Sequence, residues 1–151
     1  MLIFFSFQSC TNDDDSTTNS NGYKKTVIPS NIKDLYQAIG PETSDTIIVY
    51  SHGGPSEKLD ISDIEETQFK NYYRVYVKQA QHINTTIHAN EITFDQAIEE
   101  GNISTDIFYN VLQHFKTKEK TVIAMSHSLG SFIIPNVLAT KPNISDKVIL
   151  M

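Results

Sequence analysis

Residues 121–134 read TVIAMSHSLGSFII. The first part, residues 121–125, is a short apolar run with β-branched residues, which is typical of a strand that is covered on both faces of a sheet. After the turn SHSLG, the apolar residues that follow predict a helix over residues 131–139. A buried strand that enters a helix through so short a turn indicates a parallel α/β sheet.

Ser128 stands at the apex of this turn. The residues two before and two after it, Ser126 and Gly130, are small, as a sharp strand-to-helix turn requires if it is to lift a hydroxyl above the sheet edge. Such a hydroxyl attacks a carbonyl carbon once a base takes its proton. We therefore predict Ser128 as a nucleophile, with Ser126 as the weaker candidate. The alternative is an ordinary strand–helix turn whose serine only caps the helix.

A second glycine turn follows another predicted buried strand. Residues 46–50 read TIIVY, a continuous β-branched and apolar run, and residues 51–55 read SHGGP. Glycines let backbone amides approach a substrate because no Cβ stands in the way. We expect the N–H groups of Gly53 and Gly54, with that of Leu129 just after Ser128, to form an oxyanion hole, which stabilises the negative charge of a tetrahedral intermediate.

The remaining pattern predicts further strands and helices. Strands are expected over residues 23–28, 73–77 and 147–151. Helices are expected over residues 30–39, 62–69 and 106–115. A further helix is expected to begin at a capping box formed by Thr93 and Gln96 and to break near Gly101. Strands that alternate with helices indicate βαβ units. The sequence therefore predicts an α/β fold with a mostly parallel sheet and flanking helices.

Residues 44–151 resemble the central half of an α/β-hydrolase. The resemblance rests on the order of buried strand, His-Gly-Gly-Pro loop (residues 52–55), helix, strand, helix, strand, elbow (residues 126–130) and helix. The loop is similar to that of the proline iminopeptidase branch and related esterases. The resemblance implies a partial α/β-hydrolase fold, no cofactor, and acyl transfer from an ester or amide substrate to water through an acyl-enzyme on Ser128.

In this family an Asp or Glu and then a histidine follow the nucleophile along the chain. After Ser128 the only acidic residue is Asp146, which precedes a predicted strand, and no histidine follows. We therefore expect the catalytic acid and base, with the C-terminal strands and helices of the fold, to lie beyond residue 151, and expect the fragment itself to be inactive. The alternative is a non-catalytic, surface-anchored binding lipoprotein that keeps a hydrolase-like fold.

Five histidines are present, and none has the spacing of a metal site. His52 is expected to brace its loop and His127 to pack at the turn, whereas exposed or capping positions are expected for His82, His88 and His114. A single cysteine argues against a zinc site built on thiolates. The net charge of −6 argues against a nucleic-acid binder, which needs a basic face. We expect no metal and no nucleic acid.

The N-terminus departs from the rest of the chain. Residues 1–7 are almost wholly apolar but too few to span a bilayer, and Ser9-Cys10 follows. This pattern resembles a bacterial lipobox, and the aspartates after it resemble the export signal of Bacteroidota surface lipoproteins. We predict a signal remnant over residues 1–10, lipidation of Cys10, a flexible tether over residues 11–22 and a domain over residues 23–151. The protein would then be lipid-anchored in the cell envelope; the alternative is an incidental cysteine in a frayed terminus.

Overall fold

The structure, a computed structural model, describes residues 22–54, 56–62 and 69–151. The signal remnant with Cys10, nearly all of the tether over residues 11–22, and the interior of the helix predicted over residues 62–69 lie outside the described residues. Those three predictions therefore stay predictions. Within the described ranges, no helix combines the length and the apolar character that crossing a membrane requires.

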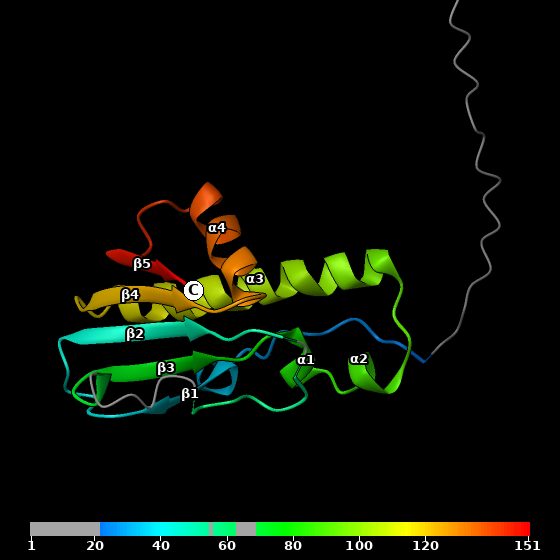
Figure 1. Ribbon diagram of the computed structural model, residues 1–151, viewed down its shortest axis with the longest axis horizontal. Coiled ribbons are helices and arrows are strands. Elements are labelled where there is room, and N and C mark those ends of the chain that lie inside the picture. Colours follow the sequence, from blue (N-terminus) through cyan, green and yellow to red (C-terminus); the bar gives the residue numbers. More distant parts are fainter. Residues whose placement is uncertain (1–21, 55, 63–68) are drawn as a thin grey trace, which may run out of the picture.

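Five strands form the central sheet (Figure 1). They are β1 (Tyr36–Ile39), β2 (Thr46–Ser51), β3 (Tyr73–Val77), β4 (Thr121–Ser126) and β5 (Lys147–Leu150), in the spatial order β1-β3-β2-β4-β5. β1 pairs antiparallel with β3, and the other pairs are parallel. The predicted α/β fold with a mostly parallel sheet is confirmed, and so are four predicted strands, over residues 46–50, 73–77, 121–125 and 147–151.

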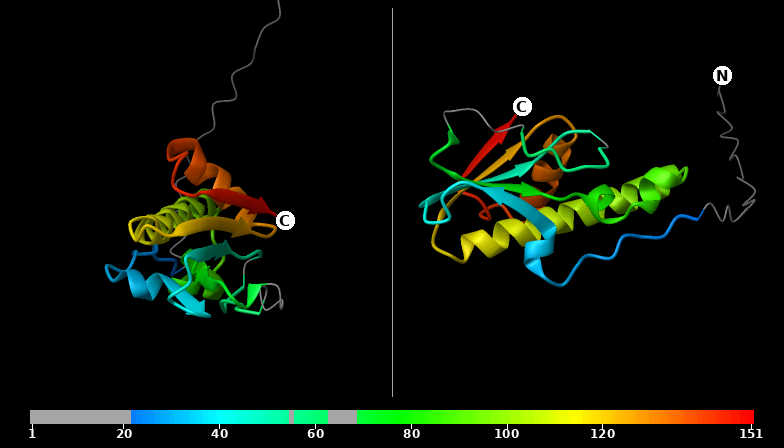
Figure 2. Two further views of the ribbon diagram at one scale, coloured as in Figure 1. Left: turned by 90° about the vertical axis from the view of Figure 1, so that its left-hand side faces the viewer. Right: turned by 90° about the horizontal axis from the view of Figure 1, so that it is seen from below.

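The helices gather on one face of the sheet and beyond the carboxyl ends of its strands (Figures 1 and 2). They are the 3₁₀ turn η1 (Ile32–Leu35), α1 (Ala80–Ile83), α2 (Thr86–Ala89), α3 (Phe94–Lys116) and α4 (Gly130–Thr140). The long helix α3 packs against α4 and against the middle of the sheet. Helix α4 confirms the helix predicted over residues 131–139.

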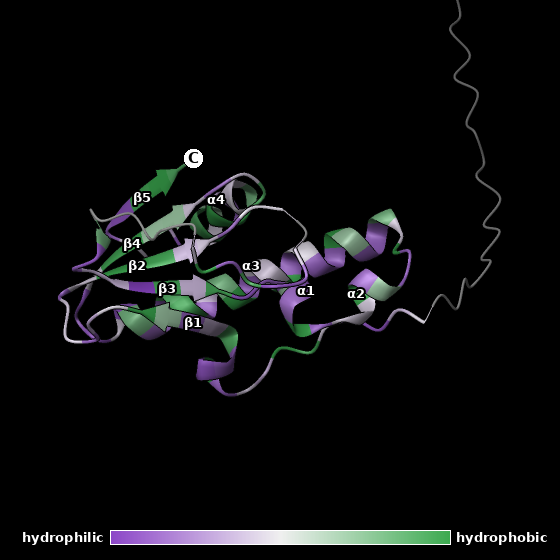
Figure 3. Ribbon diagram, turned by 60° about the horizontal axis from the view of Figure 1, so that its bottom comes forward, coloured by the Kyte–Doolittle hydropathy of each residue, from purple (hydrophilic) through white to green (hydrophobic). Residues whose placement is uncertain are grey.

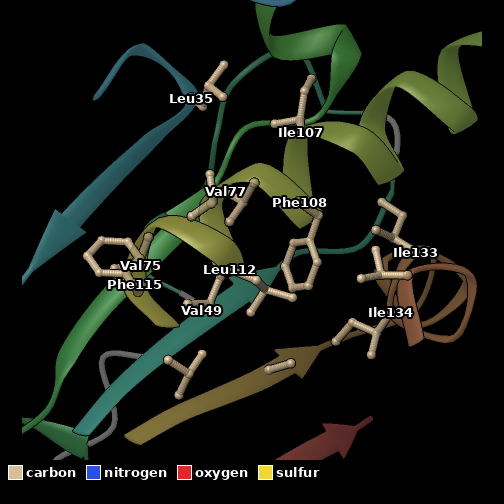
Figure 4. Close-up of a cluster of buried hydrophobic side chains, with 14 of the residues drawn as sticks. Leu35, Val49, Val75, Val77, Ile107, Phe108, Leu112, Phe115, Ile133 and Ile134 are labelled. Atoms are coloured by element: carbon tan, nitrogen blue, oxygen red, sulfur yellow. The ribbon is translucent and has the colours of Figure 1, made fainter. Parts of the chain in front are cut away.

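Alternate strand positions supply two apolar clusters. On the helical face, Val49 and Val75 pack with the buried stripe of α3, which includes Phe108 and Leu112 (Figure 4). On the opposite face a second cluster contains Ile48, Tyr50, Tyr76 and Met125, with Leu59 and Ile61 packed against it. Because both faces are covered at the middle of the sheet, the central strands β2 and β4 are largely continuous apolar runs rather than alternating ones.

Helix α3 runs unbroken through Gly101, so the predicted break there is wrong. Hydrophobic and hydrophilic residues alternate along its whole length (Figure 3). The capping box is confirmed, since the N–H of Gln96 donates to Thr93 Oγ1 at 3.3 Å and the N–H of Thr93 donates to Gln96 Oε1 at 2.8 Å. One glycine costs a helix about 1 kcal/mol, which the cap and the buried stripe outweigh.

Strand β1 occupies residues for which the sequence predicts a helix. Only the turn η1 is helical in the predicted range of residues 30–39. Leu35 is buried, and the Tyr36 ring lies edge-on to Phe115 with the ring centroids 5.4 Å apart. Backbone pairing with β3 satisfies the N–H and C=O groups while keeping this burial. Tertiary pairing therefore overrides the local helical pattern.

Residues 23–28 form no strand, contrary to the prediction. The N–H of Thr26 donates to Glu100 Oε1 at 2.9 Å, and the Tyr23 hydroxyl donates to the same oxygen at 2.5 Å. Lys25 forms an ion pair with Glu99. The hydrogen-bond partners of this segment are therefore side chains of α3 and of Asn84 and Thr86 rather than a neighbouring strand.

The carboxyl ends of β2 and β4 lie side by side, with Ser51 opposite Ser126. The connection that follows β2 crosses the face of the sheet where Leu59 and Ile61 pack. The helix that follows β4 packs Ile134 into the opposite face. Neighbouring connections that leave toward opposite faces open a crevice at the strand ends, which is the usual ligand position in open α/β sheets.

At this crevice the first residue of α4 touches the backbone of β2. A Cβ added to Gly130 would lie 2.2 Å from the carbonyl oxygen of Ser51 and 2.9 Å from that of His52. Any side chain at this position would therefore push α4 away from the sheet. The expectation that a small residue must follow Ser128 by two positions is confirmed.

We expect Gly130→Ala to lower the free energy of unfolding by about 2–3 kcal/mol, because the added methyl overlaps backbone that cannot move aside. Gly101→Ala is the matched control. An added Cβ at Gly101 meets nothing within 4 Å, so this variant should be more stable than wild type by up to about 1 kcal/mol through helix propensity. Urea denaturation of the three proteins measures both changes, and equal midpoints for the two variants would contradict the contact at Gly130.

Candidate active site

Ser128 occupies the turn between β4 and α4 in a left-handed backbone conformation. Its φ is 50°, and among the described non-glycine residues only Glu119 also has a positive φ. This conformation costs an L-residue about 1–2 kcal/mol, so the surroundings must hold it in place. The N–H of Ser131 donates to the Ser128 carbonyl at 2.8 Å, and the N–H of Gly130 donates to the His127 carbonyl at 3.0 Å. The predicted sharp turn is confirmed, with an exposed Ser128 at its apex.

Ser126, the weaker candidate nucleophile, lies at the end of β4 and is completely buried. Its hydroxyl lies 3.2 Å from that of Ser131 at the start of α4. A substrate carbonyl has no access to a hydroxyl in this position. Of the two serines, only Ser128 is open to a substrate.

The loop after β2 lies directly against Ser128. A Cβ added to Gly53 would lie 2.7 Å from the Cβ of Ser128 and 3.0 Å from Nδ1 of His127. Gly54 has a φ of 72°, which favours glycine. The two glycines are thus required for different reasons: Gly53 for the close approach and Gly54 for the turn. The fold brings together the two glycine turns that stand far apart in the sequence.

Ser128, Gly53 and Gly54 line one hollow of about 370 Å³, together with His52, Ser56, Asp60 and His127. The backbone N–H groups of Gly53, Gly54 and Leu129 donate to no other described residue. Leu129 also stands at the N-terminus of α4, where the helix dipole favours negative charge. Free amides beside a nucleophile are what a developing oxyanion requires.

His52 and His82 form a pair behind the glycine loop. The N–H of Gln79 donates to His82 Nδ1 at 2.8 Å, and the two Nε2 atoms lie 2.8 Å apart. His52 Nδ1 lies 2.6 Å from the Gly53 carbonyl, to which it donates. These bonds are compatible only when His82 carries its proton on Nε2 and both rings are neutral. The expectation that His52 braces its loop is confirmed.

Gln79 is a second brace, and it is almost completely buried. Its Nε2 donates to the His52 carbonyl at 2.8 Å and to Ser51 Oγ at 3.2 Å. The sequence did not predict that Gln79 and His82 support the glycine loop. Their position just after β3 could have indicated this role, because the carboxyl ends of neighbouring parallel strands meet at one edge of the sheet.

The other histidines have less specific surroundings than this pair. His127 packs against Gly53 at the turn as expected, since a Cβ added to Gly53 would lie 3.0 Å from its Nδ1, although the residue as a whole is exposed. His82 caps α1, which is one of the two roles expected for it. His88 and His114 are half-buried rather than exposed. Neither nitrogen of His52 or His82 is free to take a proton from Ser128.

Asp146, the acidic residue that follows Ser128 in the sequence, lies at the opposite end of β4. Its Oδ2 accepts from the N–H of Val122 at 2.8 Å, and its Oδ1 accepts from Lys116 Nζ at 2.5 Å. The hydrogen bond from Lys116, followed by that from Val122, holds the pKa of this carboxyl below its usual range. Asp146 therefore links α3 to the sheet and is remote from the crevice.

Among residues 22–54, 56–62 and 69–151, no group of three or more His, Cys, Asp or Glu side chains is arranged to hold a metal ion. Comparison with models of known protein families finds no match to this chain. Comparison with curated proteins finds no significant match either. The geometry of the crevice is therefore the basis for inferring a function.

Ser128→Gly should be more stable than Ser128→Ala by about 1 kcal/mol. Both variants lack the hydroxyl, but only glycine adopts a φ of 50° without steric cost. Thermal or urea unfolding of the two variants measures the difference. An alanine variant equal to or more stable than the glycine variant would show that the turn holds no strain.

Burial, followed by the nearby His52, His88 and Lys78, lowers the pKa of His82 to about 4. The unfolded chain takes up this proton near pH 6.5, so the stability contributed by the neutral ring is complete above pH 6.5 and is lost as the pH falls toward 4. We expect a loss on the order of 1 kcal/mol, since solvent screens this partly exposed ring.

His82→Gln tests this pH dependence, because a glutamine amide offers an acceptor and a donor but does not titrate. The free energy of unfolding is measured at several pH values between 4 and 7, with His127→Gln, a change at an exposed ring, as the control. The His82 variant should lose less stability on acidification than wild type and the control. Three parallel curves would rule out His82 as the titrating group.

Proposed function

We propose that the protein is a serine hydrolase of the α/β-hydrolase type, acting on an ester or amide through an acyl-enzyme on Ser128. The observation that carries this proposal is the contact of a strained, exposed serine with the amide-bearing Gly53-Gly54 turn. A strand–helix turn that only caps a helix needs neither the positive φ nor the second glycine turn. Both features cost stability and are typical of functional sites.

In the proposed reaction Ser128 Oγ attacks the carbonyl carbon of the substrate. A C–O bond forms, the carbonyl π electrons move to oxygen, and a general base takes the hydroxyl proton. The amides of Gly53, Gly54 and Leu129 stabilise the resulting oxyanion, an effect worth about 3–4 kcal/mol for one such donor in other enzymes. The bond to the leaving group then breaks and that group takes the proton. Water then attacks the acyl carbonyl while the base takes one of its protons, and the ester bond to Ser128 breaks as Oγ receives that proton, which releases the acid.

The resemblance to α/β-hydrolases implies a base histidine that follows the nucleophile in the chain. His52 and His82 are hydrogen-bonded to each other and to the backbone rather than to Ser128. The second candidate function is a non-catalytic binding protein with a hydrolase-like fold, and the hydrogen bonds that engage both ring nitrogens of His52 and of His82 favour it. Envelope anchoring through a lipid on Cys10 is compatible with both functions and remains a proposal.

Labelling of the full-length protein with a fluorophosphonate probe distinguishes the two functions. Phosphonylation replaces the P–F bond by a bond to the serine oxygen and releases fluoride, so it requires an activated serine. We expect labelling of wild type and loss of labelling in Ser128→Ala, with any esterase turnover reduced by at least roughly 10³-fold.

Ser56→Ala is the matched control, because Ser56 lines the same hollow but lies outside the turn. This variant keeps the Ser128 hydroxyl and should therefore still be labelled. Equal labelling of wild type and Ser128→Ala would remove Ser128 from the mechanism. Absence of labelling in wild type would favour the non-catalytic binding protein.

A further inference from the structure

A second hollow, of about 440 Å³, lies beside the proposed active site. It is bordered by α2, by the N-terminal half of α3, by the start of α4 and by the Gln79–Gln81 segment. These elements meet beyond the carboxyl ends of the strands (Figure 1). Its volume is in the range of small-molecule sites, which are mostly apolar cavities of about 300–1,000 Å³.

The walls of this hollow are chiefly apolar. The apolar lining residues include Ile87, Ile92, Ile98, Leu129, Phe132 and Ile133. Phe132 is 72% exposed and Ile98 is 49% exposed, although both stand on helices that otherwise pack against the fold. Large apolar side chains that face an open cavity are costly to leave in water, so they indicate an apolar ligand.

The hollow shares no lining residue with the hollow at Ser128, but three of its lining residues adjoin the proposed catalytic groups. Leu129 lines the hollow, and its N–H is one of the proposed oxyanion donors. Gln79 and Gln81 form another wall, and their amide groups donate to the carbonyls of His52 at 2.8 Å and Gly54 at 3.4 Å. The residues that hold the glycine loop therefore also border the apolar hollow.

We propose that this hollow, the acyl cavity, binds the aliphatic acyl chain of an ester whose carbonyl carbon lies at Ser128. The inference rests on the proposed function and adds the substrate class. A carbonyl carbon at Ser128 has two substituents. The hollow at Ser128 includes the polar residues His52 and Asp60 in its lining and is left for the alcohol part, whereas the acyl cavity is chiefly apolar and is lined in part by Leu129, the residue that follows the nucleophile.

Gly101 offers a way to fill the acyl cavity without disturbing the fold. It lines the cavity from α3, and a Cβ added there meets nothing within 4 Å. A phenylalanine at this position would occupy space that the acyl chain needs, and it would also remove the helix cost of glycine. Gly101→Ala is the matched control, since it changes the helix in the same way but leaves the cavity largely open.

Binding of fatty acids to the full-length protein tests the cavity without any chemistry at Ser128. Each buried methylene strengthens binding by about fourfold. Titration calorimetry should therefore show decanoate binding at least tenfold more tightly than butanoate to wild type and to Gly101→Ala. Gly101→Phe should weaken decanoate binding at least tenfold. Equal affinities for the two acids in wild type, or equal decanoate binding by the two variants, would overturn the inference.

Labelling rates with decyl and ethyl fluorophosphonates then separate this inference from the proposed function. We expect wild type and Gly101→Ala to react faster with the decyl probe, and Gly101→Phe to lose that preference while it keeps its rate with the ethyl probe. An unchanged decyl preference in Gly101→Phe would overturn the acyl cavity but leave Ser128 as the nucleophile. If neither probe labels wild type, the proposed function is wrong and the acyl placement is wrong with it.

Discussion

Contact between the backbones of β2 and α4 is the constraint on which the rest of the structure depends. Gly130 approaches the Ser51 carbonyl so closely that an added Cβ would lie 2.2 Å from its oxygen. A Cβ added to Gly53 would lie 2.7 Å from the Cβ of Ser128. Parallel pairing of β2 with β4 places both turns at one edge of the sheet. The close packing then fixes the direction in which α4 leaves β4, and it holds Ser128 at its positive φ.

Three neighbouring parallel strands contribute different parts of the candidate site. β4 presents the serine, β2 presents the glycine amides, and the segment after β3 supplies Gln79 and His82, which hold the glycine loop from behind. Because both histidine rings are neutral in this arrangement, they keep the loop in position without adding a charge beside the hollow. Gln79 also borders the acyl cavity, so the loop and the proposed substrate site share one support.

The sequence predicted the elements whose signal is local. The β-branched runs of β2 and β4 and the capping box at Thr93 have direct physical causes in neighbouring residues. Predictions were wrong where a distant partner decided the outcome. Tyr36 joins a strand because β3 and Phe115 lie beside it, and Thr26 bonds to Glu100 instead of to a strand. The local sequence of neither segment indicates which distant residues it will contact.

The chain alone specified which residue types could do chemistry: a serine between small residues, and two glycines after a buried run. Only the tertiary structure decided that these turns touch and that Ser126 is buried while Ser128 is exposed. It also decided that His52 is hydrogen-bonded to His82. The physical reason is that strand pairing and helix packing set distances between residues remote in sequence, whereas local patterns reflect only backbone preference and the need to bury apolar surface.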